Sequence, residues 1–234
     1  MRRATFDQER GVDRASTSVT FARASERVEV VVKQDTRARA RESDGTARWV
    51  WDCAPKTCEY LCARAREIVR GRRVIEIGAG AGMPGLVCAQ LGAREVTLTD
   101  MESELTLLET NARANDTREC DVRVEALRWG DCEKLLARDS YELVVCSDVV
   151  YKQPPETLRA LADTVEAACA PNGTVVLAYY FRENLMDDRE FFELIDESFE
   201  ERARVDFTDA PDVWLFELAK RPSRRSRPSV DAEP

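Results

Sequence analysis

The amino-acid sequence predicts an α/β fold, a doubly wound and mostly parallel sheet of seven strands. Short apolar runs alternate with segments of helical spacing through most of the chain, a pattern typical of strands and crossover helices. A glycine-rich loop, Gly78 to Gly85, directly follows one of these apolar runs. The last two runs are joined by a turn too short for parallel strands, so the sheet should end in an antiparallel pair.

The order of the elements follows from the hydrophobic spacing and from the turn residues between the runs. Two β-rich runs, 18–22 and 27–33, predict a leading hairpin. The runs that predict strands of the sheet are 73–77, 95–100, 122–127, 141–146, 173–181, 203–207 and 213–218. The segments with helical spacing are 55–70, 84–92, 102–114, 155–170 and 189–199. Residues 209–212 predict the turn that joins the last two strands.

The length of 234 residues predicts one domain with short extensions. We expect an N-terminal extension over residues 1–45 with the hairpin at about 17–33, a main domain over 46–221 and a disordered tail over 222–234. No apolar run approaches the ~20 residues that cross a bilayer, and no apolar stretch follows the first arginines. We therefore expect a cytoplasmic protein without a membrane partner, with the nucleus as the alternative.

Composition excludes several classes of function. The chain holds no histidine, which excludes Ser-His-Asp and Cys-His nucleophile pairs and any histidine-ligated metal site, and we expect no metal. The eight cysteines form no Cys-x-x-Cys pair and are expected to be reduced. A net charge of -9 argues against a nucleic-acid partner, because binding to phosphates needs a basic face. We expect a monomer.

The loop after the first strand of the sheet predicts a cofactor site. Its residues, Glu76-Ile-Gly78-Ala-Gly80-Ala-Gly82, stand where a parallel strand turns into a helix, and open α/β sheets bind ligands beyond the carboxyl ends of their strands. Gly80 to Gly85 also match the dinucleotide pattern Gly-x-Gly-x-x-Gly. The glycine spacing therefore leaves a nicotinamide cofactor and S-adenosylmethionine both open.

Asp100 ends the next predicted strand. A carboxylate at this place can accept hydrogen bonds from both ribose hydroxyls of an adenosyl group. Both cofactors contain that ribose, so Asp100 supports a nucleoside-containing cofactor without choosing between them. The alternative role of this carboxylate is to cap the helix that follows.

Four sequence elements beyond the glycine spacing choose between the cofactors. They are Val50-Trp51-Asp52-Cys53-Ala54, Glu76-x-Gly78-x-Gly80-x-Gly82, Leu127-Arg128-Trp129-Gly130 and Ser147-Asp148-Val149-Val150-Tyr151. Together they resemble the seven-β-strand methyltransferases, and within them the methyltransferase-like protein-lysine methyltransferases that modify non-histone proteins. Asn111 and Asn115 also stand at the spacing of that family. The resemblance runs from the leading hairpin to Leu218 and implies a Rossmann-like methyltransferase fold with S-adenosyl-L-methionine as the cofactor.

By this resemblance, the cofactor contacts residues from several parts of the chain: Trp51, Glu76, Gly78, Ala79, Gly80, Gly82, Asp100, Trp129 and Ser147. Glu76 would support the glycine loop and Asp100 would hold the ribose. Trp129 would lie against the adenine, a flat ring on which an aromatic side chain can stack, and Trp51 would lie near the sulfonium. For both tryptophans, packing in the core is the alternative. The family pattern is not complete, because Ala81 replaces its usual hydroxyl residue.

Asp148 and Tyr151 match the family's Asp-x-x-Tyr and would be the catalytic residues. Asp148 would position an amine and stabilise the positive charge that reaches nitrogen during methyl transfer. Tyr151 would orient the amine or close the pocket. The alternatives are a helix cap for Asp148 and surface packing for Tyr151.

The predicted function is S-adenosylmethionine-dependent N-methylation of a non-histone protein substrate that presents a lysine. Methylation of arginine, histidine or a small molecule is the nearest alternative, since a fold does not determine its acceptor. An NAD(P)-dependent oxidoreductase and a catalytically silent interaction protein are the alternatives from other classes. The acidic residues of the helix at 189–199 either receive a basic substrate or form a solvated face.

Overall fold

Strands and helices alternate along the chain, as the hydrophobic spacing predicts. This computed structural model describes residues 4–5, 18–35, 48–117, 119–133, 140–151, 153–182 and 185–222. The strands of the main sheet are β4 (Arg73–Ile77), β5 (Glu95–Asp100), β6 (Asp121–Ala126), β7 (Tyr141–Ser147), β8 (Cys169–Tyr180), β9 (Phe199–Phe207) and β10 (Ala210–Lys220). The helices are α1 (Cys53–Ala63), the π-helical turn η3 (Ala65–Val69), α2 (Met83–Gln90), the 3-10 turn η4 (Glu102–Glu104), α3 (Leu105–Ala114), α5 (Pro155–Ala168) and α6 (Leu185–Ser198). A smaller sheet holds β1 (Ala4–Thr5), β2 (Ser18–Arg23) and β3 (Val28–Lys33).

The main sheet has the strand order β6-β5-β4-β7-β8-β10-β9. β6, β5, β4, β7 and β8 pair in parallel, whereas β10 is antiparallel to both of its neighbours. The order reverses between β4 and β7, and such a point is where doubly wound sheets bind ligands. The predicted fold class, including the antiparallel pair at the end, is confirmed.

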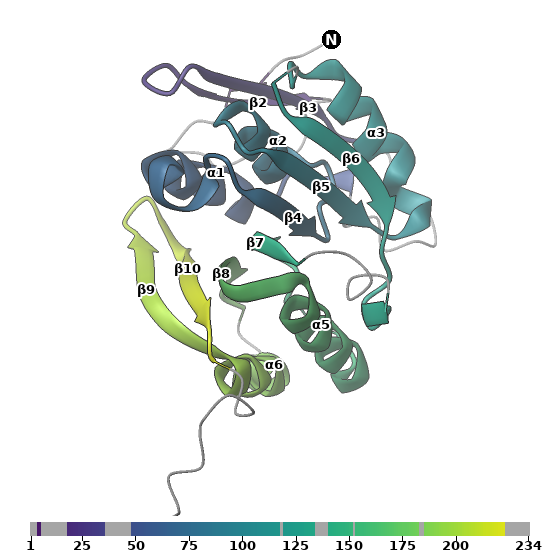
Figure 1. Cartoon of the computed structure of the whole chain (residues 1–234), viewed down its shortest axis with the longest axis vertical. Helices are drawn as coiled ribbons and strands as arrows, with labels where there is room; N and C mark the ends of the chain where they lie inside the picture. The colour runs from purple at the N-terminus through teal and green to yellow at the C-terminus, as the bar shows by residue number, and fades with distance from the viewer. Residues whose placement is uncertain are drawn as a thin grey trace, which may run out of the picture.

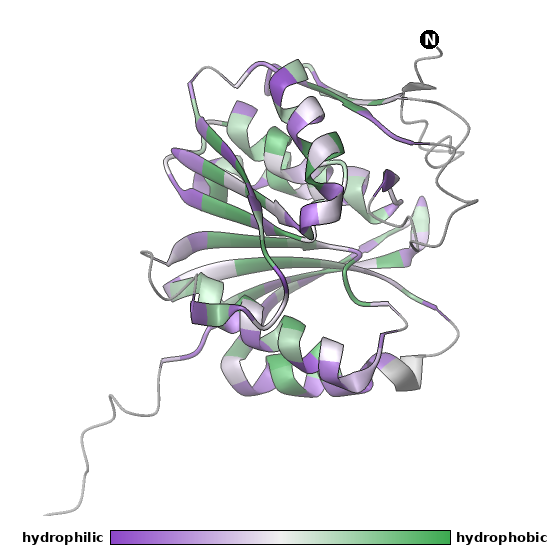
Figure 2. Cartoon of the chain, turned by 90° about the vertical axis from the view of Figure 1, so that its right-hand side faces the viewer, coloured by the Kyte–Doolittle hydropathy of each residue, from purple (hydrophilic) through white to green (hydrophobic). Residues whose placement is uncertain are grey.

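Helices cover both faces of the sheet, with α1, α2 and α3 on one side and α5 and α6 on the other (Figures 1 and 2). Side chains alternate between two cores along the central strands: Val74 and Val145 join the first, Ile75 and Val144 the second. Because both faces are covered, these strands are apolar throughout, as parallel strands usually are. Among the described residues, no helix is long and apolar enough to cross a membrane.

Some element ends differ from the predicted ones. The helix predicted at 55–70 begins at Cys53 and changes to a π-helical turn after Ala63. β8 and β9 begin four residues before their predicted starts at 173 and 203, at Cys169 and Phe199. The turn predicted at 209–212 lies at 208–209 instead, because Ala210 already pairs with Phe207. A register shift follows Ala210 and accommodates the proline that made this segment look like a turn. Most of the predicted extension outside the hairpin and nearly all of the predicted tail lie outside the described residues.

The predicted leading hairpin is confirmed: β2 and β3 pair in antiparallel register, and the hairpin lies over α2 and α3 (Figure 1). The free edge of β3 is satisfied by side-chain amides, which we call the amide clamp: Gln90, Asn111 and Asn115. Each amide oxygen accepts a backbone N–H of β3 at 2.8 Å and each amide nitrogen donates to a carbonyl of the same strand. The clamp thus imitates a neighbouring strand and protects an edge that would otherwise be open.

Asn111 connects the hairpin to the glycine loop. Its Nδ2 donates to the carbonyl oxygens of Lys33 at 3.1 Å and of Ala81 at 2.9 Å, and its Oδ1 accepts the N–H of Lys33. The side chain is completely buried. A single amide therefore holds the end of β3 and the loop that precedes α2 at a fixed distance.

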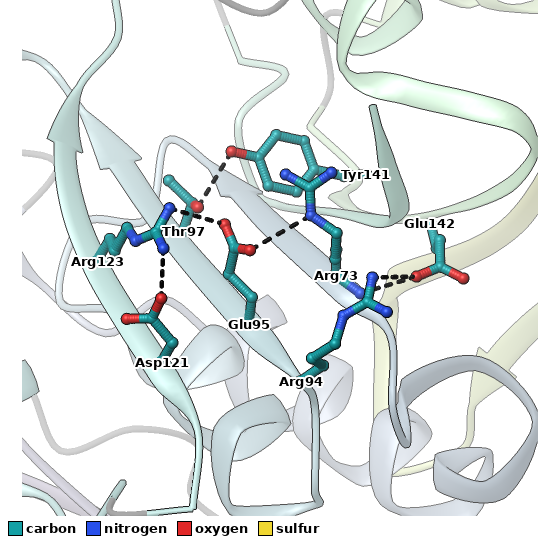
Figure 3. A network of polar contacts seen from close by, with 8 residues as sticks. All are labelled: Arg73, Arg94, Glu95, Thr97, Asp121, Arg123, Tyr141 and Glu142. Carbon is teal, nitrogen blue, oxygen red and sulfur yellow. Dashed lines mark hydrogen bonds and ion pairs between the residues drawn. The ribbon is translucent and has the colours of Figure 1, made fainter. Parts of the chain in front are cut away.

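Charged side chains tie the amino ends of the parallel strands together (Figure 3). Glu95 accepts from Arg73 at 3.3 Å and from Arg123 at 3.2 Å, and Arg123 also pairs with Asp121. These groups are at least partly exposed, so each pair stabilises the fold by less than ~1 kcal/mol. These ion pairs account for the polar character of this end of the sheet. The predicted site residues lie at the opposite end.

Candidate functional site

The predicted site residues gather at one edge of the sheet, which we call the carboxyl edge. β4, β5, β6 and β7 are parallel neighbours, so their carboxyl ends lie side by side (Figure 1). The strand ends and loops of this edge carry Glu76, Gly78, Ala79, Gly80, Gly82, Asp100, Trp129, Ser147, Asp148 and Tyr151. Trp51 lies in the turn before α1, where its carbonyl accepts the N–H of Ala54 at 2.9 Å. The topology thus brings together residues that are far apart in the sequence.

The glycine loop adopts a backbone that favours glycine at three positions: φ is +67° at Gly78, +53° at Gly80 and +81° at Gly82. At Gly78 there is also no room for a side chain. A Cβ there would lie 2.7 Å from Cγ1 of Val149 and 3.6 Å from Cζ2 of Trp129. Trp129 and the glycine loop are therefore neighbours, as the resemblance implies.

The carboxylate of Asp100 faces the glycine loop. Its Oδ2 accepts the N–H of Gly80 and its Oδ1 accepts the N–H of Met101, each at 2.7 Å. The following η4 has no side-chain cap, so capping is not the role of Asp100. These two bonds fix the orientation of the carboxylate beside the glycine loop.

Glu76 is buried beneath the loop and its Oε2 accepts the N–H of Gly85 at 2.9 Å. Burial raises the pKa of Glu76 to about 8; the bond from Gly85 acts in the opposite direction, and the charge of Asp100 adds to the rise. Glu76 therefore supports the start of α2 from inside, as predicted, and does so mainly as the neutral acid at neutral pH.

The ionisation of Glu76 predicts a pH dependence of stability. The glutamate ionises near pH 4.5 in the unfolded chain and near pH 8 in the folded one. Between these two pH values the folded state therefore binds more protons than the unfolded state. The free energy of unfolding then falls as pH rises through this range. Glu76→Gln should remove this fall, and the variant should gain stability relative to the wild type between pH 5 and pH 9 in urea titrations.

Glu142→Gln is the matched control of opposite sign. A hydrogen bond from Arg72 lowers the pKa of Glu142, so its stabilisation is present at neutral pH and is lost on acidification. Stability curves of wild type and Glu76→Gln that run parallel over the whole pH range would contradict the buried, protonated state of Glu76.

Trp129 is held in place by its own loop and by α5. The N–H of Gly130 donates to Oγ1 of Thr164 at 2.8 Å, and that hydroxyl donates to the carbonyl of Ala160 at 2.7 Å. Gly130 has a φ of +96°, which a glycine adopts without strain. The indole is partly buried against the second core, so a packing role and a place at the carboxyl edge are compatible.

Asp148 has a left-handed backbone, with φ of +56°, and only 2% of its side chain is exposed. It does not cap α5, which begins after Pro154 without a side-chain cap. Both of its oxygens instead accept from Nη2 of Arg182, at 2.9 and 3.1 Å. Burial raises the pKa of Asp148 above its ordinary value, although the charge and the hydrogen bonds of Arg182 act in the opposite direction.

Ser147 and Tyr151 flank this aspartate in the sequence, and both are partly buried. Thr57 of α1 donates to the hydroxyl of Ser147 at 3.4 Å. The carbonyl of Val150, next to Tyr151, accepts from Arg182 at 3.4 Å. The loop after β7 is thus fixed by α1 on one side and by the end of β8 on the other.

Sequence reasoning missed two residues of this edge. Arg182 is 34 positions from Asp148 and belongs to none of the motifs. Met101 is 54% exposed and is the one exposed large hydrophobic residue in the part of the chain that the structure describes. Its position directly after Asp100 was the available indication.

Three acidic residues of α6 have partners within the protein. Asp188 is buried and accepts from the hydroxyl of Tyr179 at 2.8 Å. Glu190 pairs with Arg159 and Glu193 with Arg189. These contacts favour an ordinary solvated helix face over a landing site for a basic substrate.

The residues of the carboxyl edge fit the adenosyl cofactor that the resemblance implies. The glycine loop is closely packed at Gly78, the carboxylate of Asp100 is oriented by the N–H of Gly80, and the indole of Trp129 lies beside Gly78. An aromatic ring, an acceptor for sugar hydroxyls and a glycine backbone are groups that suit a nucleoside.

Solved structures support the fold. A ribosomal protein L11 methylase from Lactobacillus delbrueckii subsp. bulgaricus has a TM-score of 0.52 at 18% identity, with 73% of this chain and 78% of that one covered. SMU.776 in complex with SAH has a TM-score of 0.58 at 10% identity, with 82% of this chain and 53% of that one covered.

Several known proteins are more similar in sequence to this chain than these solved structures are. EEF1A lysine methyltransferase 3 of Mus musculus is 37% identical over 138 residues, which are 59% of this chain and 57% of that protein. Protein N-lysine methyltransferase METTL21A of Danio rerio is 38% identical over 140 residues, 59% of this chain and 62% of that protein. METTL21A of Mus musculus is 30% identical over 207 residues, 88% of each chain. The family model described as lysine methyltransferase matches residues 32–198, and this chain belongs to the lysine methyltransferase family.

Proposed function

We propose that this chain is an S-adenosylmethionine-dependent methyltransferase that methylates a lysine of a non-histone protein. The observation that carries the proposal is the pair of oriented carboxylates at the carboxyl edge: Asp100 at the end of β5, beside the glycine loop, and Asp148 directly after β7, with β4 between these two strands. One suits a sugar and the other an amine. The names of the related proteins agree with a lysine acceptor.

Each residue has a distinct role in this proposal. Gly78, Gly80 and Asp100 would hold the ribose and methionine parts of the cofactor, and Trp129 would stack on the adenine. The bound cofactor supplies an electrophilic methyl group on a sulfonium. Trp51 would face that cation with its ring.

Asp148 and Tyr151 would act on the acceptor. A lysine amine is nucleophilic only after it has lost its proton, and its ordinary pKa is near ~10.4. The proton would pass to solvent, and Asp148 would then accept a hydrogen bond from the neutral amine and orient its lone pair. As positive charge develops on nitrogen, that hydrogen bond becomes stronger. Tyr151 would close the site or orient the amine.

We also propose a cytoplasmic location. The eight cysteines are all free, and seven of them are buried. Burial raises the pKa of the thiols of Cys58, Cys88 and Cys146, so they are unreactive core residues. Such a set of thiols suits a reducing compartment.

The glycine loop gives a test of the cofactor site. Gly78→Ala puts a Cβ 2.7 Å from Val149 in a backbone with φ of +67°, and should weaken cofactor binding at least about tenfold, which is ~1.4 kcal/mol. Gly71→Ala is the matched control: its φ is +71°, but no atom lies within 4 Å of the added carbon. Equal affinities for the two variants in calorimetry would contradict the assignment of this loop.

The proposed reaction is tested with purified protein, a labelled methyl donor and a cell extract that lacks the protein, followed by mass-spectrometric mapping. We expect label on a lysine of a protein acceptor. Label on arginine, on histidine or on a small molecule would overturn the lysine assignment, and no transfer to any acceptor would overturn the proposed activity.

A further inference from the structure

Arg182 is fixed against Asp148 by several independent contacts. Besides the two bonds from Nη2 to the carboxylate, its Nη1 donates to the carbonyl oxygens of Tyr180 at 3.1 Å and Val150 at 3.4 Å. The guanidinium carbon lies 5.3 Å from the centre of the Tyr180 ring. These contacts leave the guanidinium in one orientation, although 32% of the Arg182 side chain is exposed. Arg182 therefore has a fixed position at the carboxyl edge.

The other described groups that act on Asp148 do not supply a positive charge. Asp52 adds a negative charge, which raises the pKa of Asp148. The thiol of Cys53 is buried and neutral, because burial raises its pKa far above the ordinary value. The hydroxyl of Tyr180 donates to Asp212 at 3.3 Å. Among the residues that the structure describes, Arg182 is the cation in contact with Asp148.

The pairing of Arg182 with Asp148 determines the electrostatic environment that an acceptor lysine would enter. A buried carboxylate without a partner either takes up a proton or holds the first ammonium that reaches it. An ammonium held in this way has a raised pKa and loses its proton less readily, which opposes its use as a nucleophile. A guanidinium–carboxylate pair has almost no net charge, so it attracts an ammonium only weakly. The guanidinium also places a positive charge close to that ammonium.

We propose that Arg182 is a positioning residue of the acceptor site, which keeps Asp148 ionised while cancelling its charge, so that the acceptor lysine is held as the neutral amine. The proton of the incoming ammonium leaves to solvent, and the amine N–H then donates to Asp148. This inference rests on the proposed function, because it assigns a role within the lysine site. It accounts for a carboxylate that is buried, paired and yet placed to accept a hydrogen bond.

The first test needs neither cofactor nor acceptor. The carboxyl carbon of Asp148 is followed by NMR in protein labelled with ¹³C-aspartate, and its signal is identified by its loss in Asp148→Asn. Arg182→Gln should raise the pKa of Asp148 by about one unit or more, since an opposite charge at this distance lowers the pKa of an aspartate by about one to three units. Arg182→Lys should keep most of the wild-type value. Arg159→Gln, which removes an exposed arginine paired with Glu190, should change nothing.

The second test is the pH profile of kcat with the acceptor protein that the extract experiment identifies. In Arg182→Gln the ammonium form is favoured in the complex, so the profile should move to higher pH by about one unit. At neutral pH kcat should fall while KM stays the same or falls, and Arg182→Lys should restore most of kcat. A merely structural loss would lower kcat equally at every pH.

An unchanged pKa of Asp148 in Arg182→Gln would overturn the proposal, and so would a pH profile of kcat that superimposes on that of the wild type. If the wild type transfers no methyl group at all, the proposed function fails, whereas the NMR measurement still decides whether Arg182 sets the ionisation of Asp148.

Discussion

Asp148→Asn should lower methyl transfer by about a hundredfold or more, the scale found when one electrostatic group is removed from a reacting centre. The amide keeps the shape of the side chain but removes the negative charge. Arg182 then stays beside the site as an uncompensated cation and opposes the positive charge that develops on the acceptor nitrogen. Cofactor affinity should be unchanged, because Asp100 and the glycine loop are untouched.

The measurement is single-turnover methyl transfer together with cofactor calorimetry on the same preparation. Asp163→Asn is the matched control, since this aspartate is exposed on α5 and should leave both quantities unchanged. Turnover of Asp148→Asn at the wild-type rate would remove Asp148 from the acceptor site.

Asn111→Ala should lower the free energy of unfolding by about 2–4 kcal/mol, since it leaves one buried and two part-buried backbone groups without their partner at ~1–3 kcal/mol each. The groups are the N–H and carbonyl of Lys33 and the carbonyl of Ala81. Because the last of these belongs to the glycine loop, cofactor affinity should fall as well.

Urea titrations of three variants measure how the loss of stability depends on the burial of the lost hydrogen bonds. Gln90→Ala removes the exposed member of the amide clamp, where water replaces the lost partner, and should cost least. Asn115→Ala should fall between the two, since its bonds are part-buried like those of Asn111 to Lys33, but it has no counterpart of the buried bond from Asn111 to Ala81. A cost for Gln90→Ala as large as that for Asn111→Ala would contradict the importance of burial in the clamp.

Residues tied to a strand end were predictable from the sequence. Asp100 closes one apolar run, Glu76 stands one residue before the end of another, and Gly78 follows that second run directly. In a parallel sheet these ends meet at one edge, so their proximity follows from the order of elements alone. The fold class was predictable for the same reason, because alternation of strands and helices leaves few topologies.

Contacts made by long side chains across the fold were not predictable. Asn111 was noticed for its spacing, but nothing in the sequence indicates that its partners are Lys33 and Ala81. Arg182 follows β8, and its reach to Asp148 depends on how β7 and β8 are paired. The turn at 209–212 was mispredicted because a register shift lets β10 begin with a proline-containing segment.

Calorimetry of S-adenosylmethionine with the folded chain and with Asp100→Asn decides whether an adenosyl cofactor occupies the carboxyl edge. We predict one binding site in the wild type and an affinity at least about tenfold lower in the variant, because a hydrogen bond to a charged group contributes about 1.5–3 kcal/mol. Absence of binding to the folded wild type, or equal affinities for the two proteins, would contradict the site described above.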